Sequence, residues 1–138
     1  MPIIRRGRDE DFGQIAEIQA ASPEGAHWEV AGYAAYDLWV ADWDNRVAGF
    51  LATRQVAEGE GEILNLAVCP EFRRKGLGKA LLTAYLEQHP GLIFLEVRES
   101  NLAARKLYKS IGFKEIGVRP AYYDDPSEAA IVLKFHSC

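Results

Sequence analysis

Apolar positions along the chain repeat with two periods, and segments of the two kinds alternate. Continuous or alternating apolar segments, which indicate strands, fall at residues 3–6, 38–43, 47–56, 62–68, 92–97, 113–118 and 128–135. Helical spacing falls at residues 9–21, 27–36 and 76–89, and between Asn101 and Gly112. The pattern predicts a mixed α/β (α+β) fold, in which about four helices flank a sheet of six or seven strands.

Two of the predicted strands are apolar almost without interruption. Residues 62–68 read E-I-L-N-L-A-V, and residues 92–97 read L-I-F-L-E-V. Such strands are typical of the centre of a sheet that is covered on both faces. Because no repeat or linker interrupts the pattern, we expect residues 1–138 to form a single domain.

Composition narrows the class of protein. The 138 residues are 49% apolar and 26% charged, which is an ordinary globular balance. No apolar run approaches the roughly 18 residues of a membrane span, and no apolar stretch follows the N-terminal arginines as in a secretory signal. We therefore expect a cytoplasmic protein. The net charge of −4 argues against a general nucleic-acid binder. The two cysteines and three histidines lack ligand spacing, so no metal is expected.

The segment from residue 68 to residue 80 carries the most chemistry. A buried strand ends at Val68, a basic loop with Arg73, Arg74 and Lys75 follows, and the next helix begins on Gly76-Leu77-Gly78. A helix N-terminus has unpaired N–H groups and a partial positive charge, and glycines let a phosphate approach the backbone. The segment therefore predicts a cradle for a pyrophosphate, to which Lys79 adds a further positive charge.

Other interpretations of this segment are weaker. A glycine-rich turn before an amphipathic helix would explain a lone Gly-x-Gly. A Walker loop needs Ser or Thr after its lysine, whereas Ala80 follows Lys79 here. A dinucleotide-binding fingerprint needs a third glycine as well as a nearby acidic residue on the next strand, and this pattern does not fit either.

These residues resemble the acetyl-CoA motif of the Gcn5-related N-acetyltransferase (GNAT) family. The family pattern [QR]-x-x-G-x-[GA] is matched by Arg73, Gly76 and Gly78 after N-L-A-V. The resemblance continues through L-E-V-R-E-S-N at 95–101 and A-R-K-L-Y-K-S-I-G-F at 104–113. Within the family the chain resembles bacterial ribosomal-protein-alanine N-acetyltransferases, including the pair Tyr122-Tyr123.

The resemblance implies a fold and a set of cofactor contacts. The family has a mixed, mostly antiparallel sheet whose fourth and fifth strands, here 62–68 and 92–97, splay apart to admit acetyl-CoA. Backbone N–H groups from Leu66 to Val68 would bind the pantetheine and thioester, and those from Arg74 to Lys79 the pyrophosphate. The cofactor-binding residues implied are Leu66, Ala67, Val68, Arg73, Arg74, Lys75, Gly76, Leu77, Gly78, Lys79 and Asn101.

Two side chains are candidates for the chemistry of acetyl transfer. Glu96 lies in an apolar strand, where a carboxylate is costly unless it faces water or a partner. It is either a solvent-facing strand residue or, as the resemblance implies, the general base. Tyr108 lies on the apolar stripe of its helix. It is either a core tyrosine or, by the resemblance, the general acid toward the CoA sulfur; a hydrogen bond to the thiolate suits its pKa better than full proton donation.

The acceptor is the least determined part of the reaction. Deprotonation at pH 7 costs about 1.4 kcal/mol for an α-amine and about 4.6 kcal/mol for a lysine, so one carboxylate serves an α-amine more easily. Direct transfer to a protein N-terminal alanine is the first hypothesis, with Tyr122, Tyr123 and Arg119 as candidates at the peptide site. A lysine or a small amine as acceptor, a covalent acetyl group on Cys69, and a CoA sensor without turnover are the alternatives.

Overall fold

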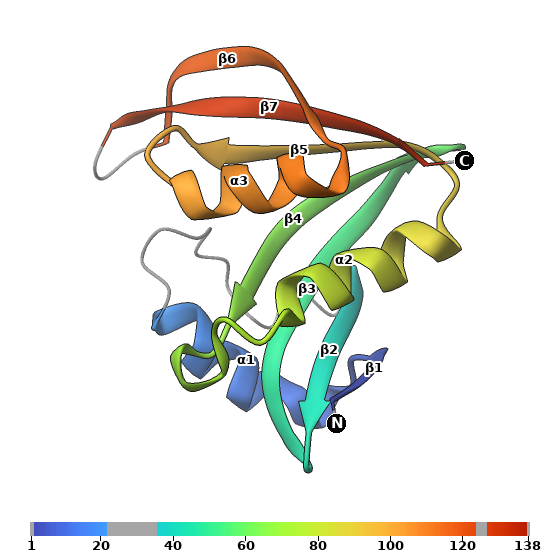
Figure 1. Ribbon diagram of the computed structural model, residues 1–138. Helices are drawn as coiled ribbons and strands as arrows, with labels where there is room; N and C mark the ends of the chain where they lie inside the picture. Colours follow the sequence, from blue (N-terminus) through green and yellow to red (C-terminus); the bar gives the residue numbers. More distant parts are fainter. Residues whose placement is uncertain (1, 22–35, 124–126, 138) are drawn as a thin grey trace.

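A seven-stranded sheet forms the centre of the molecule, with helices on both faces (Figure 1). The computed structural model describes residues 2–21, 36–123 and 127–137. The strands follow the order β1-β2-β3-β4-β5-β7-β6. Their bounds are β1 Ile3–Arg6, β2 Asp37–Trp43, β3 Arg46–Ala57, β4 Glu60–Val68, β5 Gly91–Arg98, β6 Lys114–Tyr123 and β7 Glu128–Ser137. The helices are α1 Phe12–Ala20, α2 Leu77–Gln88 and α3 Leu102–Ile111, with short 3-10 turns η1 Asp9–Asp11 and η3 Pro70–Phe72.

The fold class and the strands expected from the sequence are confirmed. All seven predicted strands are present, and most begin or end within two residues of the expected positions. The last but one is longer than expected, because β6 continues to Tyr123. The predicted helix at 9–21 begins with the 3-10 turn η1, and the helix expected at 27–36 lies largely outside the described residues. No helix of the described residues is long and apolar enough to cross a membrane.

Each face of the sheet has its own buried cluster. On one face, α2 contributes Leu81, Leu82 and Tyr85 to a core that also contains Leu95 of β5 and Tyr108 of α3. On the other face, α1 packs its apolar residues against β2 and β3, in a cluster made up of Ile15, Ile18, Leu38, Val40, Val47, Phe50, Ala52, Ala67 and Cys69. The side chains of β4 and β5 alternate between buried and partly exposed positions, so the burial on both faces that the sequence suggested for these strands is incomplete.

The parallel strands β4 and β5 separate along their length. Their register runs only from Glu60, opposite Leu92, to Ile63, opposite Leu95. Beyond these pairs β4 continues to Val68 on the edge of β3, and β5 continues on the edge of β7. The splay is visible in Figure 1, where α2 and α3 both begin near its wide end. The expected gap between the fourth and fifth strands is therefore present.

Glycines allow the close approach at the narrow end of the splay. A Cβ on Gly61 would lie 2.3 Å from the Tyr85 hydroxyl. Gly91 has a φ of +125°, and a Cβ there would lie 2.2 Å from the carbonyl oxygen of Gly59. Any larger residue at position 91 must displace backbone, so glycine is required for β5 to begin beside this turn.

Candidate active site

A cavity of about 730 Å³ lies at the wide end of the splay. It is enclosed by the end of β4, the basic loop, the first turn of α2 and the beginning of α3. Ten of the eleven residues expected to bind the cofactor line it, and Tyr108 lines it as well. The sequence analysis missed a further set of lining residues, namely Phe72, Ser100, Leu102, Ala103, Ala104 and Leu107.

The N-terminus of α2 opens onto this cavity. The loop before it turns sharply, with Arg74 at φ +65° and Gly76 at φ +77°. The Ala80 N–H donates to the Gly76 carbonyl oxygen at 3.0 Å, which closes the first helical turn. The N–H groups of Leu77 and Gly78 therefore have no acceptor within the helix. Free amides at the positive end of a helix dipole suit a phosphate.

Gly78 lies where α2 and α3 approach each other. A Cβ at this position would lie 3.1 Å from Cδ2 of Leu107 on α3 and 3.9 Å from Cδ2 of Leu66 on β4. These contacts are on the wall of the cavity, since Leu66 and Leu107 both line it. The glycine therefore keeps the helices close and leaves the first turn of α2 open to a ligand.

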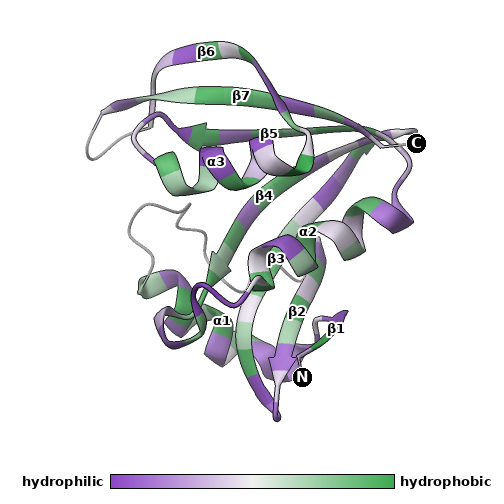
Figure 2. Cartoon of the chain, in the orientation of Figure 1, coloured by the Kyte–Doolittle hydropathy of each residue, from purple (hydrophilic) through white to green (hydrophobic). Residues whose placement is uncertain are grey.

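The basic side chains of the loop diverge. Arg73 donates from Nε to the Val68 carbonyl oxygen at 3.2 Å, which holds its guanidinium at the end of β4. Arg74 and Lys79 line the cavity. Lys75 does not line it, contrary to expectation, and its Nζ lies 5.7 Å from the ring centre of Trp43. Figure 2 shows this loop as a hydrophilic segment between β4 and α2.

The backbone of β4 presents alternate residues to the splay. The Cys69 N–H donates to the Ala48 carbonyl oxygen at 2.7 Å, and the pairing with β3 continues in register to Leu66 opposite Leu51. In an antiparallel pair, groups directed at the partner strand recur every second residue. Ala67 therefore directs its N–H to β3, while the N–H groups of Leu66 and Val68 face the splay. The Ala67 N–H, which the sequence analysis expected to bind the cofactor, is therefore directed away from the splay.

Asn101 joins the cavity to the start of α3. Its Oδ1 accepts a hydrogen bond from the Ala104 N–H at 3.2 Å and caps the helix. This bond fixes the amide group at the cavity wall, where Asn101 was expected to contact the cofactor. Residues 102–104 and Leu107 of α3 line the cavity as well, which helical spacing alone does not reveal.

Tyr108 is a buried residue of α3 at this cavity. Its side chain is 5% exposed and contacts Phe113 edge to face, with ring centres 5.4 Å apart. The side chain is therefore part of the core and also lines the cavity, while its role toward the CoA sulfur stays a prediction.

Glu96 lies on the opposite face of the sheet from Tyr108. The side chains of Leu95 and Val97 are part of the core under α2 and α3, so Glu96 between them points to the other face. It is the residue directly after the last β4–β5 pair. Oε1 is 3.1 Å from Nη2 of Arg119, and Oε2 is buried and lacks a well-formed hydrogen bond with any described residue, although the Tyr122 hydroxyl lies near the carboxylate. A carboxylate thus stands where the strands part.

Two residues of β6 surround this carboxylate. Arg119 pairs with Glu96 across the intervening strand β7, and its Cζ lies 5.0 Å from the ring centre of Tyr122. Burial raises the pKa of Tyr122, and the nearby Glu96 carboxylate raises it further, so its hydroxyl stays protonated at neutral pH. The backbone of Tyr123 pairs with Glu128, while its side chain is outside the described parts.

Cys69 is separate from the cofactor cavity. Its side chain is 8% exposed, is part of the core under α1, and has Sγ 3.7 Å from Nη2 of Arg46. It lines a different cavity, of about 270 Å³. This placement gives no support to a covalent acetyl-cysteine. Within residues 2–21, 36–123 and 127–137, no group of three or more potential ligands is arranged to hold a metal ion.

Comparisons with known proteins agree with this geometry. Residues 5–113 match the model of the acetyltransferase (GNAT) family. The [ribosomal protein bS18]-alanine N-acetyltransferase of Haemophilus ducreyi is 34% identical over 93% of this chain and 95% of its own length. An N-alpha-acetyltransferase of Sulfurisphaera tokodaii is 32% identical over 94% of this chain and 90% of its own length.

A solved structure extends the agreement to three dimensions. The crystal structure of Ard1 from Thermoplasma volcanium superposes with a TM-score of 0.89 at 28% identity, over 99% of this chain and 98% of that one. The family match covers most of the chain, and both relatives align along nearly their whole length. The chain therefore belongs to the GNAT family of acetyltransferases and is an N-acetyltransferase.

Proposed function

We propose that this enzyme transfers the acetyl group of acetyl-CoA to the N-terminal α-amine of a protein. The observation that carries the proposal is the arrangement around the splay. A cavity with free helix-terminal amides lies on one face of the sheet, and a partly buried carboxylate, Glu96, stands on the other face where β4 and β5 part. An acetyl donor held on the first side can meet an amine that enters from the second.

The cavity fits coenzyme A by the chemistry of its donors. The amides of Leu77 to Lys79 and the side chains of Arg73 and Arg74 suit the pyrophosphate. The N–H groups of Leu66 and Val68 face the gap, where the pantetheine would add hydrogen bonds to the open edge of β4. Asn101 would contact the same ligand from α3. When bound, acetyl-CoA supplies an activated thioester.

The protein groups then have separate tasks. Glu96 accepts the proton from the attacking amine, with Oε2 as the available oxygen and Arg119 holding Oε1. The N–H of Val68 polarises the carbonyl that is attacked. Tyr108 donates a hydrogen bond to the departing sulfur, since full proton transfer from a phenol to a thiolate is uphill by about 2 kcal/mol. We infer direct transfer, because Cys69 lies in another cavity.

The relatives support an α-amine as acceptor. One acts on the alanine terminus of ribosomal protein bS18, and another is an N-alpha-acetyltransferase. The physical argument points the same way, since a single carboxylate more easily deprotonates an α-amine than a lysine. Tyr122 stands beside Glu96 and would form one wall of the peptide site. A ribosomal protein as acceptor would place the reaction in the cytoplasm.

A panel of acceptors tests the proposal. Thiol release from acetyl-CoA is measured with alanine-starting peptides, with the same peptides acetylated beforehand, with lysine peptides and with polyamines. We expect release only with free alanine N-termini. Release only with lysines or polyamines would replace the acceptor and keep the enzyme class. CoA binding without release for any acceptor would favour a sensor and contradict the proposal.

A further inference from the structure

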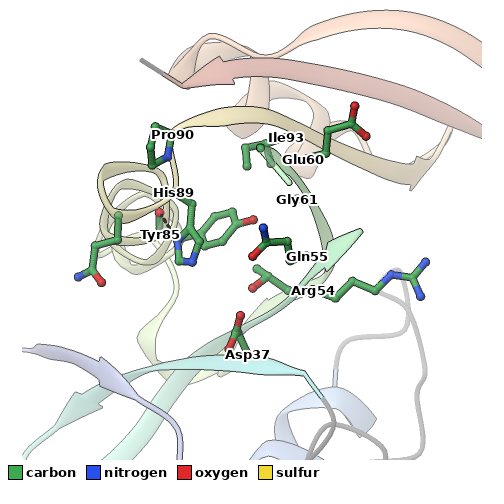
Figure 3. Close-up of a pocket in the computed structure, with 12 residues that line it drawn as sticks. Asp37, Arg54, Gln55, Glu60, Gly61, Tyr85, His89, Pro90 and Ile93 are labelled. Carbon is green, nitrogen blue, oxygen red and sulfur yellow. Dashed lines mark hydrogen bonds between the residues drawn. The ribbon is translucent and has the colours of Figure 1, made fainter. Parts of the chain in front are cut away.

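A second cavity, of about 220 Å³, lies at the closed end of the β4–β5 pair (Figure 3). It is bounded by the end of α2, the start of β2, and the β3–β4 turn. It shares no lining residue with the cofactor cavity. Pockets for drug-sized ligands have roughly 300–1,000 Å³, so this one suits a smaller molecule.

The side chains directed into this cavity are polar, and the Asp37 carboxylate among them can only accept hydrogen bonds. Figure 3 shows Asp37, Gln55, Tyr85 and His89 turned toward one another around it, whereas the charged end of Glu60 points away. The Tyr85 and His89 rings stack with centres 4.6 Å apart, which gives the cavity an aromatic wall.

Two of the lining residues have acceptor atoms to spare. Thr53 is fully buried, and its Oγ1 lacks a well-formed hydrogen bond with any described residue although the Tyr85 hydroxyl is near. Nδ1 of His89 lies 3.0 Å from the Tyr85 carbonyl oxygen. A carbonyl can only accept, so Nδ1 carries the proton, and Nε2 of the neutral ring is an acceptor. A threonine oxygen has two lone pairs, so Oγ1 can accept from a ligand even with the Tyr85 hydroxyl beside it.

Charge in the cavity is set by Asp37. Its Oδ1 binds Nη2 of Arg6 at 2.7 Å, in an exposed ion pair that leaves Oδ2 available. Burial above all raises the pKa of Tyr85 to about 12, and the Asp37 carboxylate adds to the shift, so the phenol is neutral. The guanidinium of Arg54 is turned outward and held by Glu62 at 2.7 Å. Asp37 and Glu60 are thus the acidic residues of the lining, and Arg54, the basic one, is engaged by Glu62, so the surroundings favour a cation over an anion.

We propose that this cavity binds a small organic cation rich in N–H donors, namely an alkylguanidinium or an alkylammonium group. Its donors would pair with Asp37 and Thr53, and its charge would lie against the aromatic rings of Tyr85 and His89. A neutral apolar ligand would leave the acceptors unpaired, which costs affinity. The proposal does not depend on the identity of the acetyl acceptor. This cavity shares no lining residue with the cofactor cavity, and Glu96 does not line it.

Titration of the whole protein with n-butylguanidine, n-butylamine and n-butanol tests the proposal. Binding is followed by backbone amide chemical shifts and by calorimetry. We expect the two cations to shift the amides of Gln55, Gly61 and His89 saturably, and n-butanol to leave them unchanged. The stronger of the two cations identifies the preferred group.

Three variants make the result specific. Asp37→Asn should weaken binding of the preferred cation about ten- to hundredfold, because a charge-assisted hydrogen bond is lost. Thr53→Val keeps the shape of the side chain and should weaken it about three- to tenfold. Glu60→Gln, whose carboxylate points away, should bind as the parent does. Unshifted amides, equal binding of n-butanol, or an affinity equal to the parent's in both Asp37→Asn and Thr53→Val would each overturn the proposal.

Discussion

At the closed end of the β4–β5 pair, residues 60–63 lie in register with residues 92–95, and Gly61 and Gly91 allow close packing around them. At the open end, the same two strands continue without pairing, and the edge of β4 stays free at Leu66 and Val68. Both ends are built from apolar strands. Backbone pairing between the two strands therefore stabilises the sheet at the closed end, whereas at the open end the unpaired N–H groups of β4 can bind a ligand.

The largest effect should come from a substitution that disturbs packing at the closed end of the β4–β5 pair. Gly91→Ala places a methyl group against the Gly59 carbonyl at a φ of +125°, so the free energy of unfolding should fall by roughly 4 kcal/mol. Urea denaturation measures this loss. Gly59→Ala is the matched control, because Gly59 also has a positive φ but no atom within 4 Å, and it should cost only about 1 kcal/mol. Similar losses in both would show that packing at this end is not decisive.

The next largest effect should come from replacing the Glu96 carboxylate, where β4 and β5 separate. Glu96→Gln removes the proposed base and should reduce kcat about 100- to 1,000-fold, while CoA affinity stays within twofold. Steady-state kinetics and calorimetry separate the two quantities. Glu60→Gln, at the closed end of the same pair, should leave kcat unchanged. An unchanged kcat in Glu96→Gln would remove Glu96 from the mechanism.

A substitution in the predicted pyrophosphate cradle should lower the affinity for CoA more than it lowers kcat. Gly78→Asp adds a negative charge to the first turn of α2 and crowds Leu107, so CoA affinity should fall about thirtyfold or more. Calorimetric titration with CoA tests this. Gly13→Asp, on α1 with no atom within 4 Å of its Cβ, is the control for added charge and should bind normally. Equal affinities in the two variants would contradict the cradle.

Tyr108→Phe should have a moderate effect on turnover. The variant removes the hydroxyl but keeps the ring that contacts Phe113, so the fold should persist. We expect kcat to fall about tenfold to a hundredfold, as for the loss of one hydrogen bond to a developing charge. Thermal unfolding is the companion measurement. A large loss of stability with unchanged kcat in the remaining folded enzyme would make Tyr108 a core residue only.

The smallest expected effect is the difference in CoA affinity between variants of two neighbouring basic residues, Arg74 and Lys75. Lys75 lies toward Trp43 and outside the cavity, so Lys75→Gln should change CoA affinity less than threefold. Arg74→Gln, from the cavity wall, should weaken it about three- to tenfold. Comparing both at two salt concentrations sharpens the result, because screening weakens the attraction of exposed charges. A larger effect at position 75 would contradict the observed direction of its side chain.

Much of the fold followed from local pattern. The strands at 62–68 and 92–97 were predicted because continuous apolar residues mark burial on both faces. The cradle at 73–79 was predicted because glycines, basic residues and a helix start follow one another directly along the chain. These are local properties, and the structure places ten of the eleven expected residues in one cavity.

Other features depend on the order and direction of the strands. Arg119 reaches Glu96 only because β7 lies between β5 and β6, and Ala67 loses its expected role because alternate amides face β3. The direction of Lys75 depends on Trp43 of β2, which packs nearby in space but is distant in sequence.

The family, the sheet and the loop that can hold a pyrophosphate were all predictable from the chain, because periodicity and short motifs are encoded over a few neighbouring residues. The packed structure was needed to learn which amides face the splay, which side chains enter the cavities, and which charge contacts Glu96. Those features arise where segments far apart in the chain meet, and their distances are fixed by sheet register and packing.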